Sequence, residues 1–361
     1  MLKQTLLSIE ALHKEAMERC QRRLDNLTKP LNSLHHFEQL ALQMAGITGI
    51  ARPRSLSKTL ILMAGDHGIA AETVVCGQPM LSTGQRVENI CNQNSAVNIF
   101  AEHVQAKLVL VDIGVAEDIP CSFQFKCEKI AYGTKNILQE AAMSREEAVK
   151  AVELGIKIAK EEVSKGAKVI GIGEVSFANR ISAAAIVACY TGKKPGELYP
   201  VSAQDTKERE KKLLEKVLAV HSPNLEDAMD VLRKLGGLEI AGLVGIILGA
   251  ASAQAVVVLD GLATSAAAIL AVQLNSQVKD YLVGSHYSKE PAHQEAIDYL
   301  EVPAYLHLEM DLGEGTGAAL GMSLLNASLH VLNDMKTFGE AQVAVAQDGP
   351  GALRQSHDVR E

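Results

Sequence analysis

The chain of 361 residues contains no tryptophan, and aromatic side chains make up only 4% of it. Hydrophobic residues nevertheless reach 47%, so the core must consist mainly of aliphatic side chains. Aliphatic segments rich in alanine and glycine are typical of helices packed against a parallel sheet. The composition therefore favours an α/β protein, and the length suffices for one large domain or for a domain with a smaller one beside it.

Long basic runs are also missing, and the net charge is −8. A nucleic-acid partner requires clustered lysine and arginine to neutralise its phosphates, so we expect none. The six cysteines form no Cys-x-x-Cys pair, and no His/Cys/carboxylate cluster has the spacing of metal ligands. We therefore predict no metal site and reduced thiols in a cytoplasmic protein. Residues 1–23 are charged and amphipathic, unlike a signal peptide.

The longest apolar segments, residues 240–259 and 261–274, are rich in alanine and glycine and are separated by Asp260. By length alone, a membrane span remains open. Asp260, the nearby Gln254 and the short strand-like segment 256–259 instead favour buried helix–strand–helix units. We therefore predict that the chain does not enter a membrane.

Five segments share one pattern, in which an apolar run is followed by a turn with glycine or an acid and then by a helix. Repeated βα units of this kind predict a parallel sheet with helices on both faces. Such sheets bind ligands at the carboxyl ends of their strands. The predicted strands are 58–64, 107–115, 168–174, 256–259 and 302–308.

The first predicted strand ends in Gly65-Asp66-His67-Gly68, which places polar side chains at a carboxyl strand end. Two interpretations remain open. Asp66 and His67 either contact a ligand or hydrogen-bond to each other and pin the loop. Residues 71–84 then lack periodicity and are expected to form a long loop of the kind used as a lid or substrate loop, followed by a helix over 85–100.

A glycine-rich segment, Leu312-Gly313-Glu314-Gly315-Thr316-Gly317-Ala318, lies between the last predicted strand and a helix expected over 318–335. Gly313 and Gly315 permit positive φ and the close approach of a ligand, and the following helix offers free N–H groups. Glu314 is thus placed to act as a general base. On spacing alone, a solvated glutamate that caps the helix is an equally good interpretation.

Asp260, Ser285 and His286 are three residue types that together suggest a hydrolase triad. The chain contains no Gly-x-Ser-x-Gly nucleophile elbow, and both Ser285 and His286 can instead donate hydrogen bonds to a ligand. We therefore predict a binding role, and not a nucleophilic one, for this set of residues.

Six segments carry more information together than separately: Lys29-Pro30 with Ser33-Leu34, Gly65-Asp66-His67-Gly68, the stretch 231–242, Leu259-Asp260-Gly261, Ser285-His286-Tyr287-Ser288, and the segment 312–318. Over about residues 20–345 the chain resembles the nicotinate-nucleotide:dimethylbenzimidazole phosphoribosyltransferase family. The resemblance implies a dimer whose chains each have a three-layer α/β domain and a small helical domain from both termini. The implied small domain is 1–50 plus 325–348 and the large domain with the active site is 51–324, while the polar residues 349–361 are expected to be a loose tail.

The resemblance also implies the chemistry. Nicotinate mononucleotide would donate its phosphoribosyl group to a lower-ligand base, giving an α-ribazole-type 5′-phosphate for cobamide (B12) assembly. The pyridinium leaves as neutral nicotinate, so the group required is a base that takes a proton from the acceptor, and Glu314 matches the family's catalytic glutamate. No pyrophosphate leaves, so no Mg²⁺ or other cofactor is implied. The predicted substrate-binding residues are Gln85 at the azole and Glu174, Asn179, Arg180, Asp260, Ser285, His286, Gly313 and Gly315.

The chain departs from the family pattern where phosphate is expected to bind. Ser176 replaces a glycine, and Arg180 and Ile181 replace two threonines. A glycine-rich segment expected near residues 195–206 is absent, and the family's phosphate lysine aligns near Glu210 or Lys211. Arg180 either binds phosphate through its bidentate fork or plugs the site, and both interpretations stay open.

These departures leave two hypotheses. The first is an active phosphoribosyltransferase for dimethylbenzimidazole or a phenolic base, acting as a homodimer or with a paralogous subunit. The second is a catalytically degenerate subunit of a heterodimer, as in the phenol- and p-cresol-transferring variant that the chain also resembles. We favour the first, because an idle subunit has no chemical need for Glu314.

Overall fold

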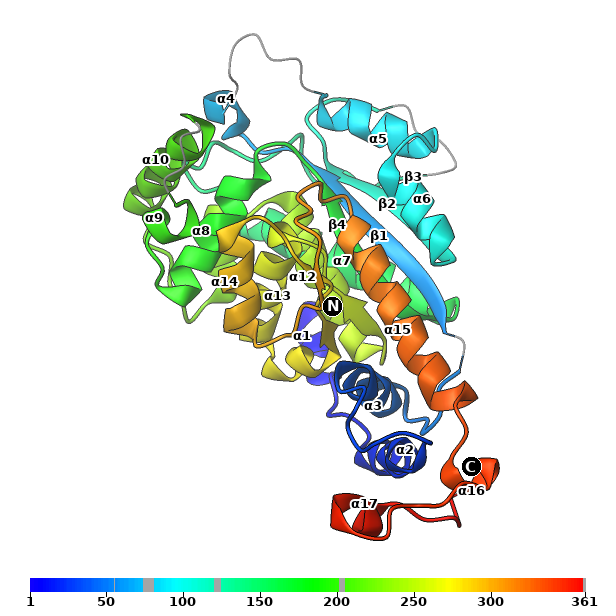
Figure 1. The fold of residues 1–361 in the computed structure, drawn as a ribbon. Coiled ribbons are helices and arrows are strands. Elements are labelled where there is room, and N and C mark those ends of the chain that lie inside the picture. The colour runs from blue at the N-terminus through cyan, green and yellow to red at the C-terminus, as the bar shows by residue number, and fades with distance from the viewer. Residues whose placement is uncertain (55, 74–80, 120–124, 201–204, 360–361) are drawn as a thin grey trace.

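A six-stranded parallel sheet forms the centre of the molecule, with the strand order β3-β2-β1-β4-β5-β6 (Figure 1). The computed structural model describes residues 1–54, 56–73, 81–119, 125–200 and 205–359. The parallel sheet predicted from the repeated βα pattern is confirmed. Its strands are β1 (Ser57–Gly65), β2 (Ala106–Gly114), β3 (Phe125–Cys127), β4 (Ala167–Val175), β5 (Val256–Val258) and β6 (Leu282–Val283).

Helices cover both faces of this sheet, which gives the predicted three-layer architecture. On one face, Gly242 of α12 lies against the side chains of Met63 and Ile113. On the other, Met322 of α15 lies against Gly171 in β4. Central strands buried on both faces explain the near-continuous apolar runs. The helices of the first face are α7 (Arg145–Ser164), α12 (Leu238–Ser252) and α13 (Leu262–Leu274), and those of the second are α6 (Ala96–His103) and α15 (Thr316–Asp334).

Helices α7 and α12 approach each other more closely than side chains normally allow. A Cβ atom added to Gly155 would lie 2.0 Å from the carbonyl oxygen of Gly242. Glycine at this contact therefore lets the two backbones touch, and the pair forms a dense layer under the sheet. This packing accounts for the glycines inside the apolar stretch that begins at residue 240.

The remaining helices lie around these layers, and α5 and α8 begin at the carboxyl end of the sheet. The helix predicted over 85–100 is two helices, because Gln93 adopts a positive φ of 58° and Ser95 begins a new helix as its N-cap. This break places the starts of α5 and α6 at separate positions near the site. These helices are α4 (Ala70–Thr73), α5 (Thr83–Cys91), α8 (Asn179–Thr191), α9 (Pro195–Leu198), α10 (Asp205–Val220), α11 (Ala228–Leu235), the 3₁₀ helix η1 (Ser276–Tyr281) and α14 (Pro291–Leu300).

The strand predicted over 302–308 is wrong as a member of the main sheet. Only β8 (Leu306–His307) forms there, and it pairs with β7 (His286–Tyr287) in a separate two-stranded sheet. Pro303 lacks a ladder donor, and Leu308 is 53% exposed. The run is therefore a surface connection that carries the chain to the start of α15.

A smaller helical unit lies away from the sheet, where α2 (Lys14–Asn26) and α3 (His36–Thr48) meet the end of α15 (Figure 1). It has its own apolar cluster, and the short helices α16 (Phe338–Ala341) and α17 (Gly349–Arg354) lie beside it. By contrast, α1 (Leu2–Leu7) contacts α7 of the large layer. The two-domain division stays a prediction that this arrangement supports. The cluster consists of Cys20, Leu24, Leu27, Ala41, Ala45 and Leu332.

The segment expected to be a loose tail is hydrogen-bonded to this helical unit as far as the structure describes it. Ser356 donates its backbone N–H to Asn26 Oδ1 at 2.6 Å, and Thr337 donates its hydroxyl to the Val359 carbonyl at 2.6 Å. Through residue 359 the tail is therefore docked on the N-terminal helices by hydrogen bonds that the polar sequence did not reveal.

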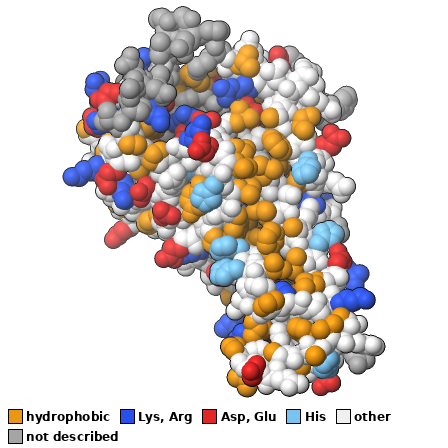
Figure 2. Space-filling model, in the orientation of Figure 1, with side chains coloured by type: hydrophobic (Ala, Val, Ile, Leu, Met, Phe, Trp, Pro, Cys, Tyr) orange, Lys and Arg blue, Asp and Glu red, His pale blue; other side chains and the backbone are white. Residues whose placement is uncertain are grey.

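The surface and the thiols bear on two further expectations. One face exposes a band of hydrophobic side chains along the region where α15 runs (Figure 2). Exposed hydrophobic residues of segments that adjoin α15 include Ile99 of α6 and Leu308 and Leu312 of the connection before α15. Within the described ranges, no helix is both long and apolar enough to span a bilayer.

Cys20 and Cys189 are free thiols, whereas Cys127 is disulfide-bonded. The expectation of reduced thiols is therefore wrong for Cys127.

Candidate active site

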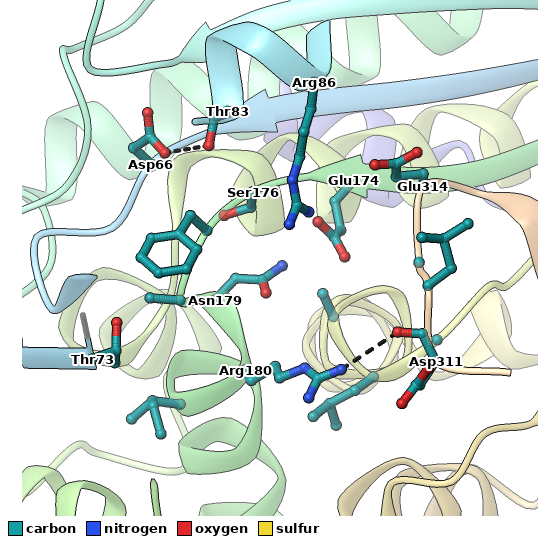
Figure 3. Close-up of a pocket in the computed structure, with 18 of the residues that line it drawn as sticks. Asp66, Thr73, Thr83, Arg86, Glu174, Ser176, Asn179, Arg180, Asp311 and Glu314 are labelled. Atoms are coloured by element: carbon teal, nitrogen blue, oxygen red, sulfur yellow. Dashed lines mark hydrogen bonds between the residues drawn. The ribbon is translucent and has the colours of Figure 1, made fainter. Parts of the chain in front are cut away.

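A pocket opens at the carboxyl edge of the sheet, as the βα pattern predicted. Asp66 follows β1, Glu174 lies at the end of β4, and Asp260 follows β5. Residues 311–314, in the loop before α15, line another wall (Figure 3). The cavity measures about 1010 Å³, at the upper end of the range for small-molecule sites, so it has room for two small ligands at once.

Glu314 occupies the centre of an unusual turn. Gly313, Glu314 and Gly315 have consecutive positive φ angles of 75°, 57° and 77°. For glutamate this left-handed conformation is uncommon and costs free energy, and such strain clusters at functional sites. The glycines on either side let the backbone make this turn, which aims the carboxylate of Glu314 into the pocket.

Asp260 holds this turn in place. Its carboxylate accepts hydrogen bonds from the backbone N–H groups of Gly315 at 2.9 Å, Gly317 at 2.7 Å and Ala318 at 3.3 Å. A buried carboxylate at a helix N-terminus is stabilised by these donors and by the helix dipole. Asp260 thus occupies the free N–H groups of α15 that the sequence offered for a ligand.

The side chain of Glu314 is fixed as well. Ser95, the N-cap of α6, donates its hydroxyl to Glu314 Oε2 at 2.9 Å. The residue is only 7% exposed, and Oε1 makes no hydrogen bond to any part of the chain that the structure describes. The alternative of a solvated helix cap is wrong, because Gly315 is the N-cap and Asp260 satisfies the helix. Glu314 therefore presents one free oxygen to the pocket.

Glu174 faces the same space (Figure 3). Burial raises the pKa of its carboxyl to about 8, and the negative charges of Glu239, Asp260 and Glu314 add to the rise. Asn179 acts in the opposite direction, although no hydrogen bond of good geometry joins the two side chains. Glu174 is therefore mainly protonated at neutral pH and can donate a hydrogen bond.

Ser285 and His286 do not form a nucleophilic centre. The Ser285 hydroxyl lies 3.0 Å from His286 Nδ1, but Ser285 is 1% exposed and is not among the residues that line the cavity. Burial lowers the pKa of His286, which keeps its imidazole neutral at pH 7. Together with the hydrogen bonds of Asp260 to α15, this geometry supports the prediction that the three residues are not a hydrolase triad.

Arg180 lies at the edge of the pocket and is already engaged. Its Nε pairs with Glu290 Oε1 at 2.9 Å, and Nη2 donates to the carbonyl of Asp311 at 3.4 Å. These bonds tie the start of α8 to the loop before α14 and to the loop before Glu314. Because its guanidinium has internal partners, Arg180 is less available to a phosphate than the sequence suggested.

Asp66 and His67 do not bond to each other, so that form of the pinning interpretation is wrong. Asp66 accepts from the Thr83 hydroxyl at 2.5 Å and from the backbone N–H of Ala116 at 2.8 Å. His67 is buried below the pocket, where Nε2 lies 2.6 Å from Glu239 Oε1 and Nδ1 lies 3.0 Å from a serine hydroxyl. Asp66 therefore connects the end of β1 to α5 and to the loop after β2, whereas His67 connects it to α8 and α12. Of the two residues, Asp66 lines the cavity and His67 does not.

The structure brings most of the predicted residues together. Ser285 and Gly315 do not line the cavity. Ser285 is hydrogen-bonded to His286, and the Gly315 N–H donates to Asp260, and both of these partners line the pocket. Gln85 lines the cavity. Its side-chain amide oxygen accepts the Ser82 N–H at 3.0 Å and so caps the start of α5. The predicted residues that line the pocket are Gln85, Glu174, Asn179, Arg180, Asp260, His286, Gly313 and Glu314.

Sequence reasoning missed Ser95 and Arg86. Ser95 was passed over because a serine inside a predicted continuous helix carries no signal of a cap. Arg86 follows Gln85 directly, and a basic residue beside a predicted binding residue was a usable signal. The direction of its side chain depends on where α5 packs, which the sequence does not give.

The fold and the pocket together are those of an open α/β protein whose ligand site contains a fixed carboxylate, Glu314. Among the described residues, no group of three His, Cys, Asp or Glu side chains is arranged to hold a metal ion.

Comparison with known proteins identifies the family. The family described as Phosphoribosyltransferase matches residues 9–343. The nicotinate-nucleotide–dimethylbenzimidazole phosphoribosyltransferase of Chloroflexus aggregans is 42% identical over 347 residues, covering 95% of this chain and 98% of the relative. The protein of the same name from Dehalococcoides mccartyi is 38% identical over 353 residues, covering 96% and 99%. The crystal structure of the Thermus thermophilus protein of that name superposes with a TM-score of 0.85 at 32% identity, covering 91% and 98%. The chain belongs to this phosphoribosyltransferase family.

Proposed function

We propose that the chain transfers the phosphoribosyl group of nicotinate mononucleotide to an aromatic base such as dimethylbenzimidazole. The product is an α-ribazole-type 5′-phosphate, the nucleotide portion of a cobamide lower ligand. The relatives that carry this activity in their names match over nearly their full length. The observation that carries the proposal is the placement of Glu314, whose free oxygen faces a cavity large enough for both substrates.

The reaction needs a base more than an acid. A ring nitrogen of the acceptor attacks C1′ of the ribose, and the C1′–N bond to the pyridinium breaks with its electron pair going to that nitrogen. The leaving nicotinate ring is then neutral and needs no proton. The acceptor becomes cationic when it bonds to C1′, and its N–H proton passes to Glu314. Attack opposite the leaving group converts the β-configured donor to the α-configured product.

Glu174 and Glu314 have different roles in this proposal. The transition state carries positive charge on the ribose ring, as in other glycosyl transfers, and carboxyl groups at the ring stabilise it. A protonated Glu174 also places no second negative charge beside Glu314. Asp260 and Ser95 are positioning residues that keep the base in reach.

The acceptor class extends to phenols in this proposal. A phenol has a pKa of about 10, so its transfer depends more strongly on the base than transfer to an azole does. The hydrophobic band along α15 (Figure 2) supports a dimer, either of two copies or with a paralogous chain. We place the enzyme in the cytoplasm.

The alternative, a catalytically degenerate subunit, is less well supported. A subunit without activity has no need to hold a strained glutamate with one oxygen free. The altered segment after β4 does not fill the cavity, since Arg180 turns to Glu290 at the edge. The plug interpretation of Arg180 therefore has no support in the geometry.

The test is direct. The purified chain is incubated with nicotinate mononucleotide and dimethylbenzimidazole, and both nicotinate and the ribotide are measured by liquid chromatography with mass detection. Equal amounts of the two products are expected, and p-cresol in place of the azole tests the phenolic class. Absence of product with every acceptor, together with binding to a paralogous subunit, would support the degenerate alternative. Sedimentation at equilibrium gives the oligomeric state in the same preparation.

A further inference from the structure

Three arginines line the pocket, and they differ in how they are engaged. Arg180 pairs with Glu290. Arg209 donates to the carbonyl of Glu72 at 2.5 Å. Arg86 also lines the cavity, yet its guanidinium makes no hydrogen bond or ion pair with any residue in the described ranges. It is the unengaged cation among the lining arginines.

The side chain of Arg86 lies inside the candidate active site. The residue lies on α5, one position after Gln85, and its side chain reaches into the pocket toward Glu174 (Figure 3). It is half-buried, so the packing around α5 restricts its direction. A guanidinium has five donors in a planar fork that matches oxyanions. Because no residue that the structure describes pairs with them, those donors are available to a ligand.

Two further donors lack partners in the same region. The hydroxyl of Ser176 and the amide nitrogen of Asn179 are buried without a hydrogen bond to the part of the chain that the structure describes. Both residues are 7% exposed and line the pocket. A buried donor without an acceptor costs free energy, and most native structures avoid it. Figure 3 shows both side chains on the side of the cavity that Arg86 enters.

The negative charges around the pocket mean that an anionic ligand needs a group of donors such as Arg86, Ser176 and Asn179 to bind. Acidic residues dominate the lining, so an anionic ligand meets net repulsion unless a cation faces it. The helix N-terminus of α15 offers no alternative, because Asp260 already occupies its N–H groups. The acidic residues of the lining are Asp66, Glu117, Glu174, Glu210, Asp260, Glu290, Asp311 and Glu314.

We propose that Arg86, with Ser176 and Asn179 beside it, binds an oxyanion of the donor nucleotide. This inference rests on the proposed function, since it assigns the anionic donor to a particular wall of the same pocket. Nicotinate mononucleotide carries two such groups, the 5′-phosphate and the pyridine carboxylate. Both are oxyanions that a guanidinium and two uncharged donors recognise. The protonated Glu174 beside them removes a negative charge that would repel either group.

The experiment measures binding by calorimetry. Arg86→Met keeps the length of the side chain and removes the charge, and Arg86→Lys keeps the charge without the fork. Arg145→Met is the matched control, because Arg145 pairs with Asp227 on the surface and does not line the pocket. Nicotinate mononucleotide is titrated into each protein. Inorganic phosphate and nicotinate are then titrated separately to distinguish the two groups.

Arg86→Met is expected to weaken mononucleotide binding by about 10- to 100-fold, with Arg86→Lys between it and the wild type and Arg145→Met unchanged. Loss of phosphate binding assigns Arg86 to the 5′-phosphate, and loss of nicotinate binding assigns it to the carboxylate. Mononucleotide affinity that stays within about twofold in Arg86→Met overturns the proposal. So does a change confined to the KM of the aromatic base.

A failure of the proposed function has a different signature. In that case the wild-type chain itself neither binds nicotinate mononucleotide nor releases nicotinate. When the wild type binds and turns over but Arg86→Met does so equally well, only the assignment of Arg86 fails. Circular dichroism and thermal unfolding of each variant show whether a loss of binding reflects a loss of fold.

Discussion

The two sides of the pocket differ in how their polar groups are satisfied. On the side of Glu314, Asp260 and Ser95 supply internal hydrogen bonds that fix the turn and the carboxylate. On the side of Arg86, the donors have no partners among the described residues. The first side is preorganised for one task, as a base must be. The second has buried donors without such partners, and this contrast separates the wall to which we assign catalysis, the catalytic wall, from the wall to which we assign binding of the donor.

The largest expected effect is on the catalytic wall. Glu314→Gln keeps the shape of the side chain but removes its ability to take a proton. Turnover should fall by about 10²- to 10⁴-fold, with mononucleotide affinity nearly unchanged. The measurement is the initial rate of nicotinate release with dimethylbenzimidazole, beside calorimetric titration of the same sample. A variant that keeps near-full turnover would remove Glu314 from the mechanism.

Asp260→Asn tests whether the turn needs its internal anchor. Asparagine keeps one acceptor oxygen but loses the charge, so the N–H groups of Gly315 and Gly317 are no longer both satisfied. We expect turnover to fall by about 10- to 100-fold through misplacement of Glu314, and stability to fall by about 1–3 kcal/mol. Steady-state rates and urea unfolding measure the two effects. Unchanged turnover with lowered stability would make Asp260 a purely structural residue.

Glu174 is expected to make the stability of the folded chain depend on pH. Its pKa is about 8 in the folded chain, against an ordinary value of 4.5, so folding favours the protonated form. The stability it contributes is fully present below about pH 4.5 and is lost as the pH rises through about 8. Glu174→Gln should therefore lose less stability than the wild type between pH 5 and about pH 8.

Denaturant unfolding across that window, with Glu146→Gln as an exposed carboxylate control, measures the Glu174 effect. Glu146 lies on the surface of α7 with a side chain that is 77% exposed, so its replacement leaves the slope of stability against pH close to that of the wild type. Equal slopes for Glu174→Gln and the wild type would show that Glu174 is not buried in its acid form.

The smallest effect is expected at Arg180. Its guanidinium is partnered by Glu290 and 44% exposed, and ion pairs of this kind contribute about 0–1 kcal/mol. Arg180→Met should change mononucleotide affinity by less than about threefold, well below the effect of Arg86→Met. Calorimetry of the two variants side by side makes the comparison. A larger loss at Arg180 would restore it as the main phosphate ligand.

The sequence alone determined the parallel α/β architecture, and it singled out Glu314 as the candidate base, a role that stays a prediction. Aliphatic runs of strand length, each followed by glycine or an acid, specify a parallel sheet because both faces of its strands must be buried. Glu314 between two glycines was recognisable because only such a turn brings the backbone through consecutive positive φ angles. These signals are local, so they are legible one segment at a time.

Only the tertiary structure decided which polar groups are engaged. Asp260 was assigned to the ligand, but it caps α15, fifty-five residues further on. Arg180 was expected either to bind phosphate or to plug the site, whereas Glu290 holds it at the edge, and the guanidinium of Arg86 has no partner among the described residues. Whether a charged side chain pairs with another residue or stays available to a ligand depends on residues distant in the chain. No local sequence pattern shows which of those residues lies beside it in the fold. The run 302–308 likewise looked like a strand, and packing placed it on the surface.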